Sequence, residues 1–153
     1  MRIIVTGMRD WEPRSRVWRA LDVATSICAL SDVIIVEGGA AGADAHAREW
    51  AAMKMVRNIS YPADWEKHGK AAGMIRNREM AHDGADVCLA FWDGKSKGTG
   101  NMIATAVANG IPVRIWPRWF NTEDEKQWFN KMHQGTLPPP SAAAGTASKP
   151  EKN

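Results

Sequence analysis

Residues 33–44 read VIIVEGGAAGAD, and this stretch decides the fold. A run of apolar, mostly β-branched residues gives way abruptly to glycine and alanine, and a helical pattern follows. This succession is typical of a buried strand, a tight turn and the first turn of a helix. Glycine is expected where the backbone bends sharply or where a ligand approaches its N–H groups. Because Gly38, Gly39 and Gly42 do not match the G-x-G-x-x-G dinucleotide fingerprint, both a phosphate-binding turn and a turn without a ligand fit this stretch.

The same alternation of strand and helix continues through most of the chain. Short apolar runs predict strands at residues 2–6, 33–36, 56–60, 87–91 and 113–116. Helical spacing predicts helices from Pro13 to about Leu30, after Gly42, from Lys70 to about His82, and after the glycine-rich turn at residues 93–100. The fold class is therefore α/β, a Rossmann-like doubly wound domain with a mainly parallel five-stranded sheet and helices on both faces.

The pattern changes after Trp116, which divides the chain into three parts. Residues 1–118 are expected to form the Rossmann-like domain. Thr122 and Glu125 make a capping box, which predicts an aromatic helix within residues 119–134 that packs on the domain or on a partner in a homodimer. Residues 135–153 are rich in proline, alanine, glycine and serine, and this composition predicts a disordered tail.

Composition excludes several classes of protein. The net charge is only +3, from 20 basic and 17 acidic side chains spread along the chain, which argues against a nucleic-acid partner. Cys28 and Cys88 are expected to be reduced and buried, and no Cys/His cluster predicts a metal site. No resident cofactor is expected. Without a leader sequence or an apolar run long enough to span a bilayer, the chain is expected to be cytoplasmic and away from membranes.

Polar and flexible residues follow the carboxyl ends of the predicted strands, where open parallel sheets bind their ligands. We expect a small molecule to bind there. The candidate ligand-binding residues are Gly7, Arg9, Asp10, Trp11, Gly38, Gly39, Gly42, Asp44, Trp65, Arg76, Asn77, Gly98, Thr99, Gly100 and Asn101.

The two glycine-rich turns are expected to differ in what they bind. Free N–H groups at the start of a helix favour an anion, but the carboxylate of Asp44 would repel a phosphate at the first turn. We therefore assign phosphate to the turn at residues 98–101, and sugar hydroxyls or a base edge to Asp44. A plain helix-capping role fits Asp44 equally well. We interpret Lys95 and Lys97 as solvated lysines in a loop.

The remaining candidates each have a structural alternative. Trp11 and Trp65 can stack on a nucleobase or plug the core. Periodicity alone places Arg76 on an exposed helix surface, although its guanidinium suits a phosphate or carboxylate. His68 fits a polar surface residue.

Five blocks in order resemble the SLOG superfamily, which includes the LOG phosphoribohydrolases and the DNA-processing protein DprA, and most resemble its YspA-like branch. The blocks lie at residues 7–11, 38–44, 63–69, 72–80 and 98–102. The resemblance implies a Rossmann-like sheet and a pocket for a nucleotide or nucleotide-derived ligand. It also implies ligand-binding roles for Arg76 and Asn77.

The chain departs from the family patterns at two positions. LOG hydrolases carry a glutamate after the glycine–threonine turn, where this chain has Asn101 and Met102, which cannot act as acid or base. YspA-like chains often carry a basic residue where Ala41 stands. We therefore expect a nucleotide-binding sensor or modifier. The alternatives are an N-glycosidic hydrolase or transferase with Asp10, Asp44 or Asp64 as catalytic carboxylate, and DprA-like binding of single-stranded nucleic acid.

Overall fold

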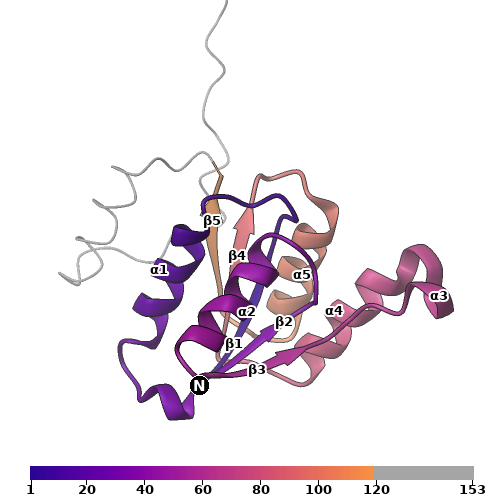
Figure 1. Ribbon diagram of the computed structural model, residues 1–153. Coiled ribbons are helices and arrows are strands. Elements are labelled where there is room, and N and C mark those ends of the chain that lie inside the picture. Colours follow the sequence, from indigo (N-terminus) through magenta and orange to yellow (C-terminus); the bar gives the residue numbers. More distant parts are fainter. Residues whose placement is uncertain (119–153) are drawn as a thin grey trace, which may run out of the picture.

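A computed structural model describes residues 1–118 and shows one parallel sheet (Figure 1). The sheet order is β3-β2-β1-β4-β5, and every neighbouring pair is parallel. Its strands are β1 (Arg2–Gly7), β2 (Ile34–Glu37), β3 (Arg57–Ser60), β4 (Val87–Trp92) and β5 (Val113–Pro117). This confirms the predicted Rossmann-like fold. The order reverses between β1 and β4, so a crevice is expected beyond the carboxyl ends of these two strands.

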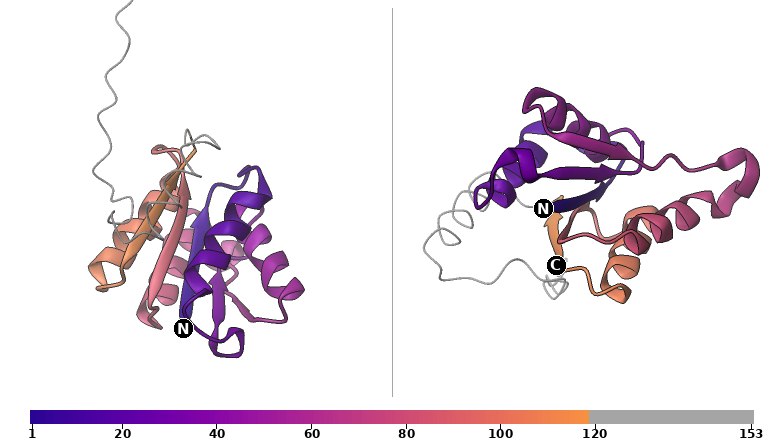
Figure 2. Two further views of the ribbon diagram at one scale, coloured as in Figure 1. Left: turned by 90° about the vertical axis from the view of Figure 1, so that its left-hand side faces the viewer. Right: turned by 90° about the horizontal axis from the view of Figure 1, so that it is seen from below.

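Helices cover both faces of the sheet (Figure 2). They are α1 (Arg14–Thr25), α2 (Ala43–Met53), α3 (Trp65–His68), α4 (Ala72–His82) and α5 (Lys97–Ala108), with short 3₁₀ turns η1 (Leu30–Asp32) and η2 (Gly69–Ala71). α1 and α2 pack on the face that carries Ile3 and Ile35, whereas α4 and α5 pack on the face that carries Ile4. α3 and the start of α4 extend away from the sheet (Figures 1 and 2).

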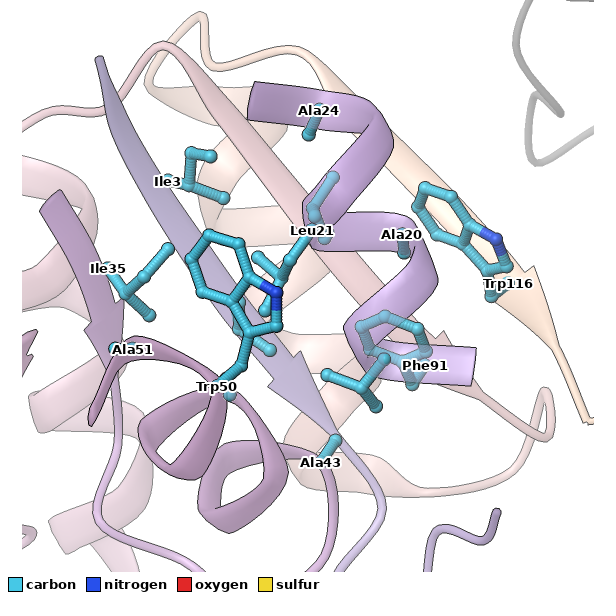
Figure 3. Packing of buried hydrophobic residues seen from close by; sticks show 14 of the residues in the cluster. Ile3, Ala20, Leu21, Ala24, Ile35, Ala43, Trp50, Ala51, Phe91 and Trp116 are labelled. Carbon is cyan, nitrogen blue, oxygen red and sulfur yellow. The ribbon is translucent and has the colours of Figure 1, made fainter. Parts of the chain in front are cut away.

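Aromatic side chains fill the larger core, between the sheet and helices α1 and α2 (Figure 3). Trp50 is buried, and its Nε1 donates to Asp22 Oδ1 at 3.0 Å. The Phe91 ring lies 5.3 Å from Trp11 and 5.4 Å from Trp116, measured between ring centroids. Burial of such rings is the main stabilising contribution of this layer.

The ends of α1 and α5 differ from the sequence prediction. α1 ends at Thr25 and not near Leu30, because the hydroxyls of Thr25 and Ser26 donate to the carbonyls of Leu21 and Val23, both at 2.8 Å. Cys28 therefore lies beyond the helix and is half-buried, whereas Cys88 is fully buried as predicted.

At the other end of the sheet, α5 begins at Lys97, before the glycines that were predicted to precede it. The Asp93 carboxylate accepts the N–H groups of Lys95 and Ser96, both at 2.8 Å, and so closes the loop early. Val107, an apolar residue near the end of α5, is 61% exposed.

A third difference lies after β3, where Trp65 and His68 belong to α3 instead of an extended loop, because Asp64 caps that helix. None of the helices within residues 1–118 is long and apolar enough to cross a membrane. The predicted aromatic helix at 119–134 and the predicted tail at 135–153 fall outside the described residues.

Candidate functional site

A cleft of about 780 Å³ opens at the carboxyl ends of β1 and β4, at the reversal point of the sheet. We call it the first cleft. Its walls come from the loop after β1, the start of α2, α3, α4 and the start of α5. It brings together these predicted site residues: Gly7, Arg9, Asp10, Asp44, Trp65, Arg76, Asn77, Gly98, Thr99 and Asn101.

A second cleft of about 340 Å³ borders the first one. It is formed by the turn at residues 38–41 and the loop at residues 62–63, together with Arg9, Trp65 and Arg76. Two further predicted residues, Gly38 and Gly39, lie here.

Close backbone approach explains the glycines beside α2. A Cβ on Gly7 would lie 2.5 Å from Ala43 Cβ, and a Cβ on Gly42 would lie 2.2 Å from the Met8 carbonyl oxygen. The Ala43 N–H donates to that same oxygen at 3.2 Å. Gly42 therefore serves helix packing at a φ of +68° and lines neither cleft, contrary to the expectation that it contacts a ligand.

Two buried carboxylates already occupy the amides of the turn after β2. Asp44 Oδ2 accepts from the N–H of Gly38 at 2.9 Å and of Ala40 at 3.4 Å, while Glu37 Oε2 accepts from Gly39 at 2.6 Å. Because these N–H groups point at protein carboxylates, a phosphate placed against this turn would meet negative charge. The turn is therefore poorly suited to bind an anion.

Glu37, which the sequence interpretation missed, helps to hold this turn through the Gly39 N–H. Its side chain is fully buried and accepts from Arg48 Nη1 at 2.9 Å, from Asn58 Nδ2 at 3.1 Å and from the Ser60 hydroxyl. The sequence did contain a signal for this role, because Glu37 directly follows a buried apolar strand. A charged side chain at such a position needs hydrogen-bond or ion-pair partners.

Burial and a neighbouring carboxylate change the protonation of Asp44. Burial and the nearby negative charge of Glu37 raise the pKa of Asp44 from 3.8 to about 6, against the opposing effect of the Gly38 and Ala40 amides and of Arg76. A carboxyl with such a pKa can exchange a proton near neutral pH.

Arg76 is half-buried and anchored, so the interpretation of it as an exposed surface arginine is wrong. Its Nη1 donates to the carbonyls of Gly38 and of Tyr61, the latter at 3.2 Å, and its Nε donates to Asn77 Oδ1 at 3.0 Å. Burial lowers the pKa of Arg76, and the positive charge of Arg9 adds to this effect.

Asn77 joins α4 to the start of α5. Its Nδ2 donates to Asn101 Oδ1 at 2.9 Å and to the Gly98 carbonyl at 3.3 Å. The side chain of Asn77 is buried, so these two hydrogen bonds hold the start of α5 in place beside Arg76.

The start of α5 forms the electropositive wall of the first cleft. Its first turn has no acidic residue, and among residues 1–118 no hydrogen bond uses the N–H groups of Lys97, Gly98 or Thr99. Such free N–H groups favour an anion. Gly100 faces away, because a Cβ there would lie 3.2 Å from the Trp92 ring.

The rim carries an exposed indole beside a guanidinium. Trp65 is 50% exposed, and Arg9 Cζ lies 5.9 Å from the centroid of its ring. Lys70 and Met74, which the sequence interpretation did not single out, also line the first cleft.

Three predicted residues have positions that limit their proposed roles. The Trp11 ring is fully buried against Phe91, so the expectation that it stacks on a ligand is wrong, and the core alternative holds. Asp64 lines neither cleft and caps α3 by accepting from the Lys67 N–H at 2.9 Å. Asp10 lies in the first cleft, is 68% exposed and pairs with Arg118 Nη1 at 3.2 Å.

Within residues 1–118, no three potential metal-binding side chains gather at one place. The side chains and amides of the first cleft offer three kinds of interaction. Cationic groups and free amides at the α5 start can hold a phosphate, the Trp65 indole can stack on a ring, and Asp44 can take or give a proton.

Comparison with known proteins adds three findings. Residues 1–68 match the family model described as the YspA, cpYpsA-related SLOG family. The gene 61 protein of Mycobacterium phage D29 is 45% identical over 119 residues, which cover 73% of this chain and 93% of the phage protein.

The third finding is a solved structure of DNA processing protein A from Helicobacter pylori, a protein with a unique single-stranded DNA binding mode. It superposes with a TM-score of 0.58 at 19% sequence identity and covers 90% of this chain and 74% of that one. At that identity the likeness establishes the fold alone.

Proposed function

This chain belongs to the YspA, cpYpsA-related SLOG family, and from that premise we propose that its first cleft binds a nucleotide or nucleotide-derived molecule. The observation that carries the proposal is the wall around the start of α5. There, Lys97 lies at a helix start that has free N–H groups and no acidic residue, and Arg9 and Lys70 line the same cleft. A phosphate at this wall gains charge-assisted hydrogen bonds.

Trp65 and Met74 supply a surface for the base. The half-exposed Trp65 indole and the exposed Met74 side chain line the same cleft. A nucleobase stacked on an indole gains about 1–3 kcal/mol. The volume of about 780 Å³ lies within the usual range for small-molecule sites.

Binding, and not fast catalysis, is the activity that we propose. The position that carries a glutamate in LOG hydrolases holds Asn101, whose Oδ1 accepts from Asn77. An amide in that place cannot transfer a proton. The chain would then act as a sensor or modifier that responds to its ligand.

The experiment is isothermal titration calorimetry and thermal unfolding of the full chain with AMP, ADP, NAD, ADP-ribose and cyclic dinucleotides. At a hundred times its Kd, a ligand stabilises the folded state by about 2.7 kcal/mol. The matched pair is Lys97→Ala, which changes the first cleft, and Lys95→Ala, which changes an exposed lysine outside it. We expect weaker binding only for Lys97→Ala. Absence of binding by all these nucleotides, or equal losses in both variants, would contradict the proposal.

Cleavage of a base–ribose bond is the second candidate, and the position of Asp44 favours it. Its carboxyl lines the first cleft with a pKa of about 6, so it can give a proton to a leaving base. Incubation with nucleoside monophosphates followed by detection of free base tests this function. Activity that persists at full rate in Asp44→Asn would exclude this carboxyl.

Binding of single-stranded DNA is a third candidate, favoured by the described binding mode of the Helicobacter pylori protein. The small net charge argued against nucleic acid, but four cationic side chains, those of Arg9, Lys70, Arg76 and Lys97, line the first cleft. Fluorescence anisotropy with a labelled oligonucleotide at two salt concentrations tests it. A specific complex would weaken as salt rises, because released counterions drive phosphate binding.

A further inference from the structure

The two clefts are contiguous and share one boundary. Arg9, Ala40, Trp65 and Arg76 line both of them. A molecule that contacts these shared residues therefore has open space on either side of them. The second cleft, at about 340 Å³, is large enough for a small chemical group of its own.

Two guanidiniums stand at this boundary with N–H groups that no described residue accepts. Within residues 1–118, Arg9 makes no ion pair or hydrogen bond, and its described contact is the Trp65 ring. Arg76 uses Nη1 and Nε for protein acceptors, while its Nη2 has no acceptor among the same residues. The carboxylates of Asp44 and Glu37 favour the charged form of Arg76, whereas the positive charge of Arg9 disfavours it, so the two guanidiniums repel each other. A phosphate between them would remove this repulsion and bind in a bidentate manner.

The rest of the second cleft is unsuited to another anion. Its far walls are the turn at residues 38–41 and the loop at Pro62 and Ala63, which carry no charged side chain. The amides of Gly38, Gly39 and Ala40 already donate to the carboxylates of Asp44 and Glu37. An uncharged sugar or ring fits this environment, and a second terminal phosphate does not.

We propose that the ligand has two ends joined by a phosphate or diphosphate, and that it occupies both clefts at once. The linking phosphate or diphosphate lies between the start of α5 and the pair Arg9 and Arg76, one end occupies the rest of the first cleft, and the uncharged other end lies in the second cleft. This inference rests on the proposed function and narrows its ligand class from mononucleotides to two-ended molecules such as ADP-ribose or a dinucleotide.

The test compares ADP-ribose with ADP as calorimetric probes on the full chain and on Ala41→Trp. Ala41 is exposed and lines only the second cleft, so a tryptophan there fills that cleft and leaves the first one open. We expect ADP-ribose to bind the unmodified chain at least about tenfold more tightly than ADP. Ala41→Trp should remove this advantage and leave the affinity for ADP unchanged.

Two further variants serve as a control and as an independent test of the second cleft. Ala104→Trp adds the same side chain at an exposed position of α5 that lines neither cleft, and should change neither affinity. Ala63→Phe fills the second cleft from the opposite wall and should reproduce the effect of Ala41→Trp, which settles the matter if Ala41→Trp unfolds at lower temperature.

The outcomes separate the two proposals. Equal affinities for ADP and ADP-ribose, unchanged in Ala41→Trp and Ala63→Phe, would overturn the two-cleft ligand and leave nucleotide binding intact. Equal losses for both probes would also overturn it, because the second cleft would then not be a separate subsite. If neither probe nor AMP binds, the proposed function itself fails.

Discussion

Substitution of Asp44 by asparagine should make this protein more stable at neutral pH. The Asp44 side chain is 5% exposed and lies beside the buried carboxylate of Glu37. Burial and the charge of Glu37 destabilise the ionised form of Asp44. The Gly38 and Ala40 amides and Arg76 stabilise that form, but their effect is smaller. Asparagine has nearly the same shape and keeps an oxygen that can accept from the Gly38 N–H, but it carries no charge.

The magnitude follows from the pKa. A rise from 3.8 to about 6 is roughly two pK units, and each unit corresponds to about 1.4 kcal/mol. Between these pH values the folded chain keeps a proton that the unfolded chain has released, so the contribution of Asp44 to stability falls as the pH rises. At pH 7 the charged carboxyl therefore costs about 3 kcal/mol relative to pH 3.5.

The assay is urea unfolding of the unmodified chain and of Asp44→Asn from pH 4 to pH 8. Relative to the unmodified chain, the free energy of unfolding of the variant should rise by about 2.4 kcal/mol from pH 4 to pH 8, with most of the rise between pH 4 and 6.5. Glu79→Gln, at an exposed position of α4, is the control and should show no such trend. A difference between Asp44→Asn and the unmodified chain that is constant with pH would refute the reasoning.

Three further substitutions test the fold and the rim. Gly42→Ala should cost roughly 3 kcal/mol in urea unfolding, because its Cβ would meet the Met8 carbonyl oxygen at 2.2 Å and because φ is +68°. Gly84→Ala is its control, with φ of +81° but open space, and should cost only about 1 kcal/mol; equal losses would contradict the close-approach argument. Trp11→Ala should cost about 3–5 kcal/mol because the ring is fully buried. Trp65→Ala should change stability by less than about 1 kcal/mol and weaken nucleotide binding in calorimetry at least fivefold; unchanged affinity would remove Trp65 from the site.

Much of the fold could be predicted because its signals are local. Continuous apolar runs such as residues 33–36 and 87–91 mark strands that are covered on both sides. The same reasoning located the rim, since the carboxyl ends of parallel strands meet at one edge. The prediction that no phosphate binds at the turn near Asp44 followed from one residue, because the Asp44 carboxylate would repel a phosphate.

The predictions that failed concern side chains whose positions depend on tertiary contacts. Trp11 and Trp65 both lie near predicted loops, yet one packs on Phe91 in the core and the other stays at the rim. No local pattern separates them. Arg76 lies on a helix with few apolar residues, and only the folded chain shows that its guanidinium reaches the Gly38 carbonyl.

The most direct test of nucleotide binding at the first cleft is a two-dimensional NMR titration of the full chain with ADP. We predict saturable shifts of the backbone amides of Gly98 and Thr99 and of the Trp65 indole N–H, with the buried Trp50 indole unmoved. Saturable shifts confined to other surfaces, or no shifts at millimolar ADP, would contradict the assignment of this cleft as the nucleotide site.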